Sequence, residues 1–321
     1  SATSPAVPPL GASLACSDSC PDDIIRHQIQ IASPTLPYRP FQDYDCGGTC
    51  GRSRAPGTTR KLPTLLYETT TYRATVYPKY GGKLASLYHK PSQRELLFDN
   101  PVWQPGQLAR LNGWTSGGVE WNWPRRGHTV FHLQPLWAVE VDSPRGPLLR
   151  LFEFDREMNT TFQVDLWADD GNSTDVRKPF YAHVKVCNSN DHAIDGYWWT
   201  NIAAPLSPRS RVAYTDGTHA IVSGGSEGLA LVPFPEFSEN PKVLSPAAHA
   251  NPSVQPTDHS YPSAYYAARE NFIRPNANGT AAPLRRAIMG IVDTASGLGT
   301  LHAQTAELGG RKFWAWGNDW N

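Results

Sequence analysis

The chain has 321 residues, of which 40% are hydrophobic, and its 29 basic residues balance 29 acidic ones. This length allows about one to three domains with a sizeable core, while the balanced charge argues against a nucleic-acid partner or an anionic membrane surface. No run of about 18 apolar residues occurs, which argues against a transmembrane helix. We therefore expect recognition to depend on a local site.

Residues 1–60 are rich in Pro, Ser, Gly and Thr and show no apolar periodicity, so we predict an extended leader. Four cysteines in this segment form two C-x3-C pairs, Cys16/Cys20 and Cys46/Cys50. Disulfides are favoured over a zinc site, because two such pairs separated by 25 residues match no zinc pattern closely. The connectivity of these disulfides stays open.

Three Asn-X-Ser/Thr sequons occur, at Asn159, Asn172 and Asn278. Together with the cysteine pairs they predict a secreted glycoprotein whose signal peptide has already been removed. The fifth cysteine, Cys187 in "YAHVKVCNS", is predicted to be a buried packing residue, because no neighbouring feature would activate its thiol.

Residues 61–321 are predicted to form one all-β domain, because about a dozen short β-type runs alternate with turn signals and helical windows are scarce. Period-two alternation places Phe162, Val164 and Leu166 on one face of a strand, and Val184 and Val186 on one face of another. So many strands indicate an antiparallel sandwich larger than an immunoglobulin-type unit.

Two later segments do not follow this alternation of short strands and turns. Residues 233–262 lack strand character, and such a long connection is predicted to be a functional loop folded over a sheet face. The final run "RKFWAWGNDWN" stops directly after an aromatic-rich strand. We therefore expect the natural chain to continue past Asn321.

The run "GWTSGGVEWNWPRRGH", residues 113–128, crowds tryptophans around one carboxylate and one histidine. The glycine pair at 117–118 predicts a turn that presents Glu120 from the start of a strand. In that strand Glu120 and Asn122 share one face, while Trp121 and Trp123 share the other. The alternative is that the tryptophans form core and Glu120 is exposed or ion-paired.

Sugars combine an apolar C–H face with a rim of hydroxyls, so a sugar site needs an aromatic platform and polar side chains. This mixture occurs three times: in residues 113–128, in "YWWTN" and in "FWAWGNDW". We predict that the three clusters meet in one groove that binds a saccharide; the alternative is core strands with incidental polar neighbours. The predicted substrate-binding residues are Trp114, Trp121, Asn122, Arg126, Trp199, Asn201, Asp258, Trp314, Trp316 and Asn318.

Three motifs carry a family resemblance: "GG-x-EWN…GH", "YWWTNIAAPLSPRSRV" and "GGRKFWAWGN". Over roughly residues 65–321 the chain resembles the domain of unknown function 5107 family of bacteria and fungi. The resemblance implies a galactose-mutarotase-like antiparallel β-supersandwich, a fold shared by aldose epimerases and by domains of glycoside hydrolases and polysaccharide lyases. It also implies further strands after the "WGN" motif.

Mutarotase-type catalysis uses a carboxylate as general base and a histidine as general acid. The epimerase base comes from a late strand and cannot be assigned to any residue here, so Glu120 and His128 are the predicted acid/base pair. The predicted reaction is glycoside hydrolysis, ahead of epimerisation and of elimination. Hydrolysis would need a second carboxylate, for which Asp258 and Asp319 are the candidates.

Two other functions stay open, namely a non-catalytic carbohydrate-binding module and a structural domain with a tryptophan core. Arg125 or Arg126 could bind a carboxylate or hold a hydroxyl. No metal or other cofactor is predicted, because neither His128 nor His259 lies in an H-x-H or HExxH pattern.

Overall fold

The computed structural model describes residues 29–43, 58–125, 127–169 and 178–205, together with strands between residues 210 and 315 and the turn at residues 296–297. Nearly all the regular structure in these residues is β, as predicted; the one helical element among them is the 3-10 turn η1 (Val130–Leu133). No helix in the described ranges is long and apolar enough to cross a membrane.

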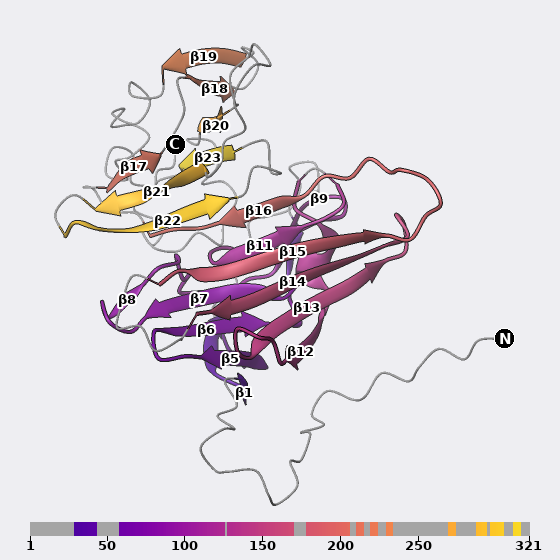
Figure 1. The fold of residues 1–321 in the computed structure, drawn as a ribbon, viewed down its shortest axis with the longest axis vertical. Helices are drawn as coiled ribbons and strands as arrows, with labels where there is room; N and C mark the ends of the chain where they lie inside the picture. The colour runs from indigo at the N-terminus through magenta and orange to yellow at the C-terminus, as the bar shows by residue number, and fades with distance from the viewer. Residues whose placement is uncertain are drawn as a thin grey trace, which may run out of the picture.

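The largest sheet has seven antiparallel strands in the order β1-β5-β6-β7-β11-β16, with β8 paired to β7 (Figure 1). Strands β5, β6 and β7 follow one another as hairpins, whereas β11 and β16 are far apart in the sequence and still pair. The strands are β1 (Ile29–Ala32), β5 (Thr64–Glu68), β6 (Tyr72–Tyr77), β7 (Lys83–His89), β8 (Arg94–Glu95), β11 (Val119–Asn122) and β16 (Trp199–Ile202).

The second layer is a four-stranded meander that packs on one face of the seven-stranded sheet (Figure 1). Each of its strands pairs antiparallel with the next along the chain, as expected of a β-meander. The strands are β12 (Trp137–Val141), β13 (Leu148–Asp155), β14 (Thr160–Ala168) and β15 (Phe180–Asn188).

The core lies between these two sheets and confirms the predicted strand faces. Phe162, Val164 and Leu166 are at most 1% exposed and belong to the same buried cluster as Val76 and Trp121 from the opposite sheet. Burying an apolar side chain of this size stabilises a fold by about 1.5–3 kcal/mol. The two-sheet sandwich is therefore held together chiefly by apolar packing.

Smaller sheets flank the sandwich, in the orders β10-β9-β3, β2-β4, β17-β21-β22 and β19-β18-β20-β23. The first group comprises β2 (Thr35–Tyr38), β3 (Gln42–Asp43), β4 (Thr58–Lys61), β9 (Gly106–Ala109) and β10 (Asn112–Trp114). The later strands are β17 (Ser210–Tyr214), β18 (His219–Ser223), β19 (Leu229–Pro233), β20 (Arg269–Ile273), β21 (Ala287–Asp293), β22 (Leu298–Gln304) and β23 (Arg311–Ala315).

The folded part of the chain starts before the boundary expected at residue 60. Strand β1 extends the seven-stranded sheet by pairing with β5, and β2 pairs with β4. Such short edge strands gain their structure from pairing and not from apolar alternation, which is why composition suggested a leader. The cysteines of the two C-x3-C pairs, and the segment 234–268, lie outside the described residues.

Two positions for which the sequence suggested a role, Asn159 and Cys187, lie on the surface. Asn159, at the turn between β13 and β14, is exposed, whereas Asn172 and Asn278 lie outside the described residues. Cys187 was predicted to be buried, which is wrong: it is exposed. It lies on the face of β15 opposite Val184 and Val186, which pack against the core.

Candidate functional site

A glycine turn fixes the start of β11. Gly117 and Gly118 have φ of +79° and +66°, in the left-handed region that favours glycine. The Gly118 N–H donates to the Phe98 carbonyl at 2.8 Å, and a Cβ on Gly118 would lie 2.5 Å from the Leu84 carbonyl oxygen. This close approach lets β11 enter the sheet beside β7, so that Glu120 is the second residue of the strand.

The register between β11 and β16 assembles one polar face. Glu120 pairs with Asn201, and Asn122 pairs with Trp199. Residues that face each other in an antiparallel pair project to the same side of the sheet, so these four side chains share a face. Trp121 projects to the opposite side, into the core, where its indole N–H donates to the Gly82 carbonyl at 3.0 Å.

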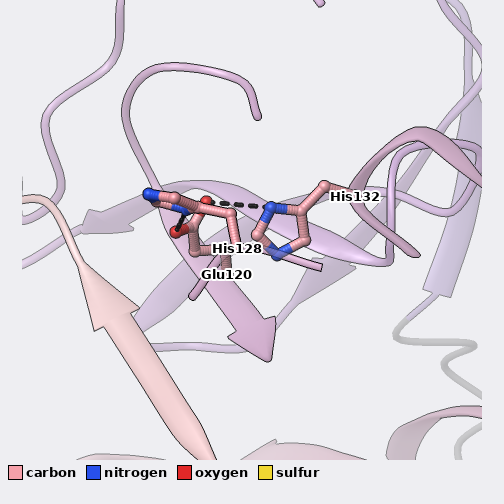
Figure 2. A group of neighbouring side chains, drawn as sticks. All are labelled: Glu120, His128 and His132. Atoms are coloured by element: carbon pink, nitrogen blue, oxygen red, sulfur yellow. Dashed lines mark ion pairs between the residues drawn. The ribbon is translucent and has the colours of Figure 1, made fainter. Parts of the chain in front are cut away.

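The chain after β11 folds back over this face and brings two histidines to the carboxylate. Thr129 N–H donates to the Asn122 side-chain carbonyl at 3.2 Å, which holds the returning segment in place. His128 Nδ1 lies 2.6 Å from Oε1 of Glu120, and His132 Nδ1 lies 3.2 Å from Oε2 (Figure 2). Each carboxylate oxygen therefore faces one imidazole.

Asn201 and Trp199 complete the surroundings of the carboxylate. The Asn201 amide donates to Oε1 of Glu120 at 2.9 Å, and the His128 ring packs against Trp199 with centroids 5.2 Å apart. His128 is 14% exposed, compared with 5% for Glu120 and 3% for His132. Of these three side chains, His128 is the one that a ligand from solvent can reach.

Burial is the largest influence on the pKa of Glu120 and works to raise it. The charges of His128, His132 and Lys83, together with the close contact of His128, outweigh burial and hold the pKa of Glu120 well below its usual range. Glu120 is therefore ionised at neutral pH although it is buried.

Burial is also the largest influence on the pKa values of Lys83 and His132, two basic neighbours of this carboxylate. It lowers the pKa of Lys83 to about 8, against the opposing attraction of Glu120. It lowers the pKa of His132 to about 4, again with Glu120 opposing. At neutral pH the site thus combines an anionic carboxylate with a neutral His132 imidazole.

This arrangement can move protons, and its donor atoms also suit a metal ion. Because Nδ1 of His128 faces the carboxylate, Nε2 points away from Glu120 and is the nitrogen available to a ligand (Figure 2). The ligand atoms of Glu120, His128 and His132 all lie within 4.8 Å of one another. One carboxylate oxygen and two imidazole nitrogens form a common zinc ligand set.

The structure brings together five of the residues predicted to form the site: Glu120, Asn122, His128, Trp199 and Asn201. They come from two segments separated by about 70 residues of sequence, and the sheet makes them neighbours. The predicted separation of Glu120 and Asn122 from the indole of Trp121 is also observed.

Other predicted residues lie elsewhere. Trp114 and Trp121 are 2% and 3% exposed, and both indoles are buried. Arg125 forms an ion pair with Glu157. Arg126, Asp258, Trp316, Asn318 and Asp319 lie outside the described residues, as does the side chain of Trp314, whose backbone belongs to β23.

Sequence reasoning missed two members of the site, His132 and Lys83. The spacing His128-x3-His132 was a usable signal, because a single turn between them can direct both rings to one point. Lys83 carried no comparable signal, since a lysine in a strand is normally exposed. Here it is 3% exposed and donates to the Thr115 carbonyl at 2.7 Å.

Comparison with known proteins gives a family and a fold. The sequence matches the family described as "Domain of unknown function (DUF5107)" over residues 33–321. A solved structure of a TPR-domain containing protein from Parabacteroides distasonis ATCC 8503 is similar, with a TM-score of 0.59 and 14% sequence identity. The match covers 91% of this chain and 46% of that one, so this chain spans less than half of its length. Identity this low shows a shared fold alone.

Proposed function

The chain belongs to the domain of unknown function 5107 (DUF5107) family, and from its site geometry we propose that it is a carbohydrate-active protein. The proposed ligand is a saccharide that contacts Trp199 and Asn201 and presents a hydroxyl or ring C–H to His128. The supporting observation is the Glu120–His128 contact of 2.6 Å, which lies beside an indole ring and a side-chain amide.

His128 is the proposed proton-transfer group, and Glu120 is its partner. An ionised carboxylate beside Nδ1 favours the tautomer that carries its proton there, which leaves the Nε2 lone pair free to accept a proton. The same carboxylate stabilises the imidazolium that results, so His128 can return the proton in the next step. Glu120 itself stays ionised throughout.

Among the reactions considered, the described groups support proton transfer on a sugar without help from any further residue. Epimerisation and elimination each need a base and an acid near one carbon or oxygen, which a carboxylate-supported imidazole can supply. Hydrolysis would require a second carboxylate about 5–9.5 Å from the first. Its candidates, Asp258 and Asp319, lie outside the described residues.

The proposal is tested by a saccharide panel with separate readouts for binding and turnover. The wild type should bind a subset of mono- or oligosaccharides and transform one of them. His128→Asn should retain binding and lose turnover by about 10²–10⁴-fold, the usual contribution of general acid–base catalysis. Trp199→Ala should weaken binding, because the aromatic surface next to His128 is removed.

Glu153→Gln on β13 is the matched control, because it removes a carboxylate from the other sheet. It should leave binding and turnover unchanged. Binding without turnover in the wild type would instead support a carbohydrate-binding module. Absence of saccharide binding across the panel would overturn the saccharide proposal.

We also propose that the protein is exported and carries a glycan on Asn159. The Asn159 side chain is exposed, and its amide donates a long hydrogen bond of 3.3 Å to the side-chain carbonyl of Asn190. Treatment of the protein from its natural source with an N-glycosidase should lower its mass by one glycan, and Asn159→Gln should abolish that difference. An unchanged mass at this peptide would refute the assignment.

A further inference from the structure

We infer that Glu120, His128 and His132 form a binding site for a divalent transition-metal ion of the Zn²⁺ type. The ligands would be one carboxylate oxygen and the Nδ1 atom of each imidazole. The inference concerns metal binding alone and does not depend on the proposed saccharide.

The three ligand atoms converge on a common point. The two Nδ1 atoms lie 2.6 Å and 3.2 Å from the two carboxylate oxygens, and one ligand atom of each residue lies within 4.8 Å of those of the other two. Tetrahedral zinc with bonds of about 2.0–2.1 Å keeps its ligand atoms roughly 3.4 Å apart. Binding therefore requires the closer imidazole to withdraw by about 0.8 Å and the most distant ligand atoms to approach by up to about 1.4 Å.

His132 supplies an independent indication, because its ring is buried and its polar neighbours, the Glu120 carboxylate and the Trp121 backbone, form no hydrogen bond of ordinary geometry with it. It is 3% exposed, and neither ring nitrogen has a hydrogen bond of ordinary geometry within the described part of the chain. Nδ1 of both histidines lies near the carboxylate but off the line of a hydrogen bond. A buried polar group left in this state is costly, and coordination of an ion by Nδ1 would satisfy it.

Neighbouring polar groups orient the ligands as metal sites require. The Asn201 amide donates to the carboxylate at 2.9 Å, which fixes its plane. The Thr129–Asn122 hydrogen bond of 3.2 Å anchors the segment that carries both histidines. Such outer contacts commonly contribute about 10–100-fold to metal affinity.

Three protein ligands would leave a fourth position of a tetrahedral ion open to water or to a ligand hydroxyl. A ligand from solvent would approach past His128, the most exposed of the three side chains. The proposed saccharide chemistry needs the His128 tautomer that carries its proton on Nδ1, and a bound ion would replace that proton. The metal-bound and metal-free forms would thus differ in how readily Nε2 accepts a proton.

The test is a Zn²⁺ titration of the chelator-treated full chain against a chromophoric competitor, with cysteine thiols alkylated. The wild type should bind one ion tightly. Glu120→Gln and His132→Gln should each weaken that binding by about 100-fold or more, since a direct ligand matters at least as much as its supports. His183→Gln, an exposed histidine of β15, is the matched control and should bind as the wild type does.

A second measurement uses only the wild type, so it does not depend on whether the variants fold. In ¹H–¹⁵N spectra of the imidazole rings, Zn²⁺ should shift the Nδ1 signals of two histidines. Unchanged Nδ1 signals, or equal affinity in the wild type and His132→Gln, would overturn the inference. Saccharide binding measured with chelator present tests the other proposal separately.

Discussion

Glu120 shows at the residue scale how a buried charge is kept in this fold. The carboxylate is 4% exposed, and it receives an amide hydrogen bond and faces two imidazoles. Removing such a charge from water is costly unless polar partners replace the solvent. The site residues are therefore a connected set, and substituting one of them changes the environment of the others.

Lys83 provides a prediction about pH. Its pKa falls to about 8 in the fold from 10.5, chiefly because of burial. Between these pH values the unfolded chain binds a proton that the folded chain does not, so this residue makes the free energy of unfolding rise with pH. Lys83→Met removes this contribution. The stability of the wild type relative to Lys83→Met should therefore rise between pH 7.5 and pH 10, by up to roughly 3 kcal/mol.

Urea denaturation of metal-free protein at both pH values measures this change. Comparing the two proteins cancels the titration of groups distant from Lys83, and the coupled groups Glu120 and His132 titrate well below this pH range. Lys185→Met, at an exposed position of β15, is the control and should show no such dependence on pH. An equal stability difference at pH 7.5 and pH 10 would contradict the assigned pKa shift.

At the scale of elements, the site depends on the entry of β11 between β7 and β16. The Gly118 carbonyl accepts a hydrogen bond from the N–H of Ala203, just beyond the end of β16, at 2.8 Å. The Gly118 N–H donates to the Phe98 carbonyl. The glycine turn is thus bonded to the segments that contain Phe98 and Ala203 before β11 begins. Any change that moves this turn also moves Glu120 relative to Asn201.

Gly118→Ala tests this dependence, and the chain contains a closely matched control. Gly118 and Gly297 have nearly equal φ, +66° and +67°, but only Gly118 has neighbours where a Cβ would lie. In Gly297→Ala only the left-handed backbone penalty should lower the free energy of unfolding, by about 1–2 kcal/mol. In Gly118→Ala the free energy of unfolding should fall by about 1–3 kcal/mol more, because the Leu84 carbonyl must move.

Denaturant midpoints measure both losses. If the two variants lost the same stability, the close approach at Gly118 would not be a constraint. The imidazole spectra of Gly118→Ala should also change, because β11 carries Glu120. Those of Gly297→Ala should remain as in the wild type.

At the scale of the whole molecule, the sandwich separates packing from chemistry. One face of the seven-stranded sheet packs against the meander through Trp121, Phe162 and Leu149, all at most 3% exposed. The other face, over β11 and β16, carries Glu120 and its histidines. Because one sheet serves both purposes, a core of apolar side chains rigidly supports the polar site.

The sequence by itself determined the fold class, the faces of the strands and the segment that carries Glu120 and His128. The all-β prediction, the burial of Phe162, Val164 and Leu166, and the opposite faces of Glu120 and Trp121 all depend on a period of two residues. That period is a local property of the backbone. Sequence inspection alone can therefore establish it.

Only the tertiary structure decided which segments meet and which rings are buried. Asn201 reaches Glu120 through a strand pairing that spans 81 residues, and His132 reaches it through the turn η1. Trp121, predicted as a ligand platform, is in the core, and β1 joins the sheet from within the expected leader. Such contacts are chosen by the packing of the whole chain, because each strand edge pairs with whichever segment completes the shared core.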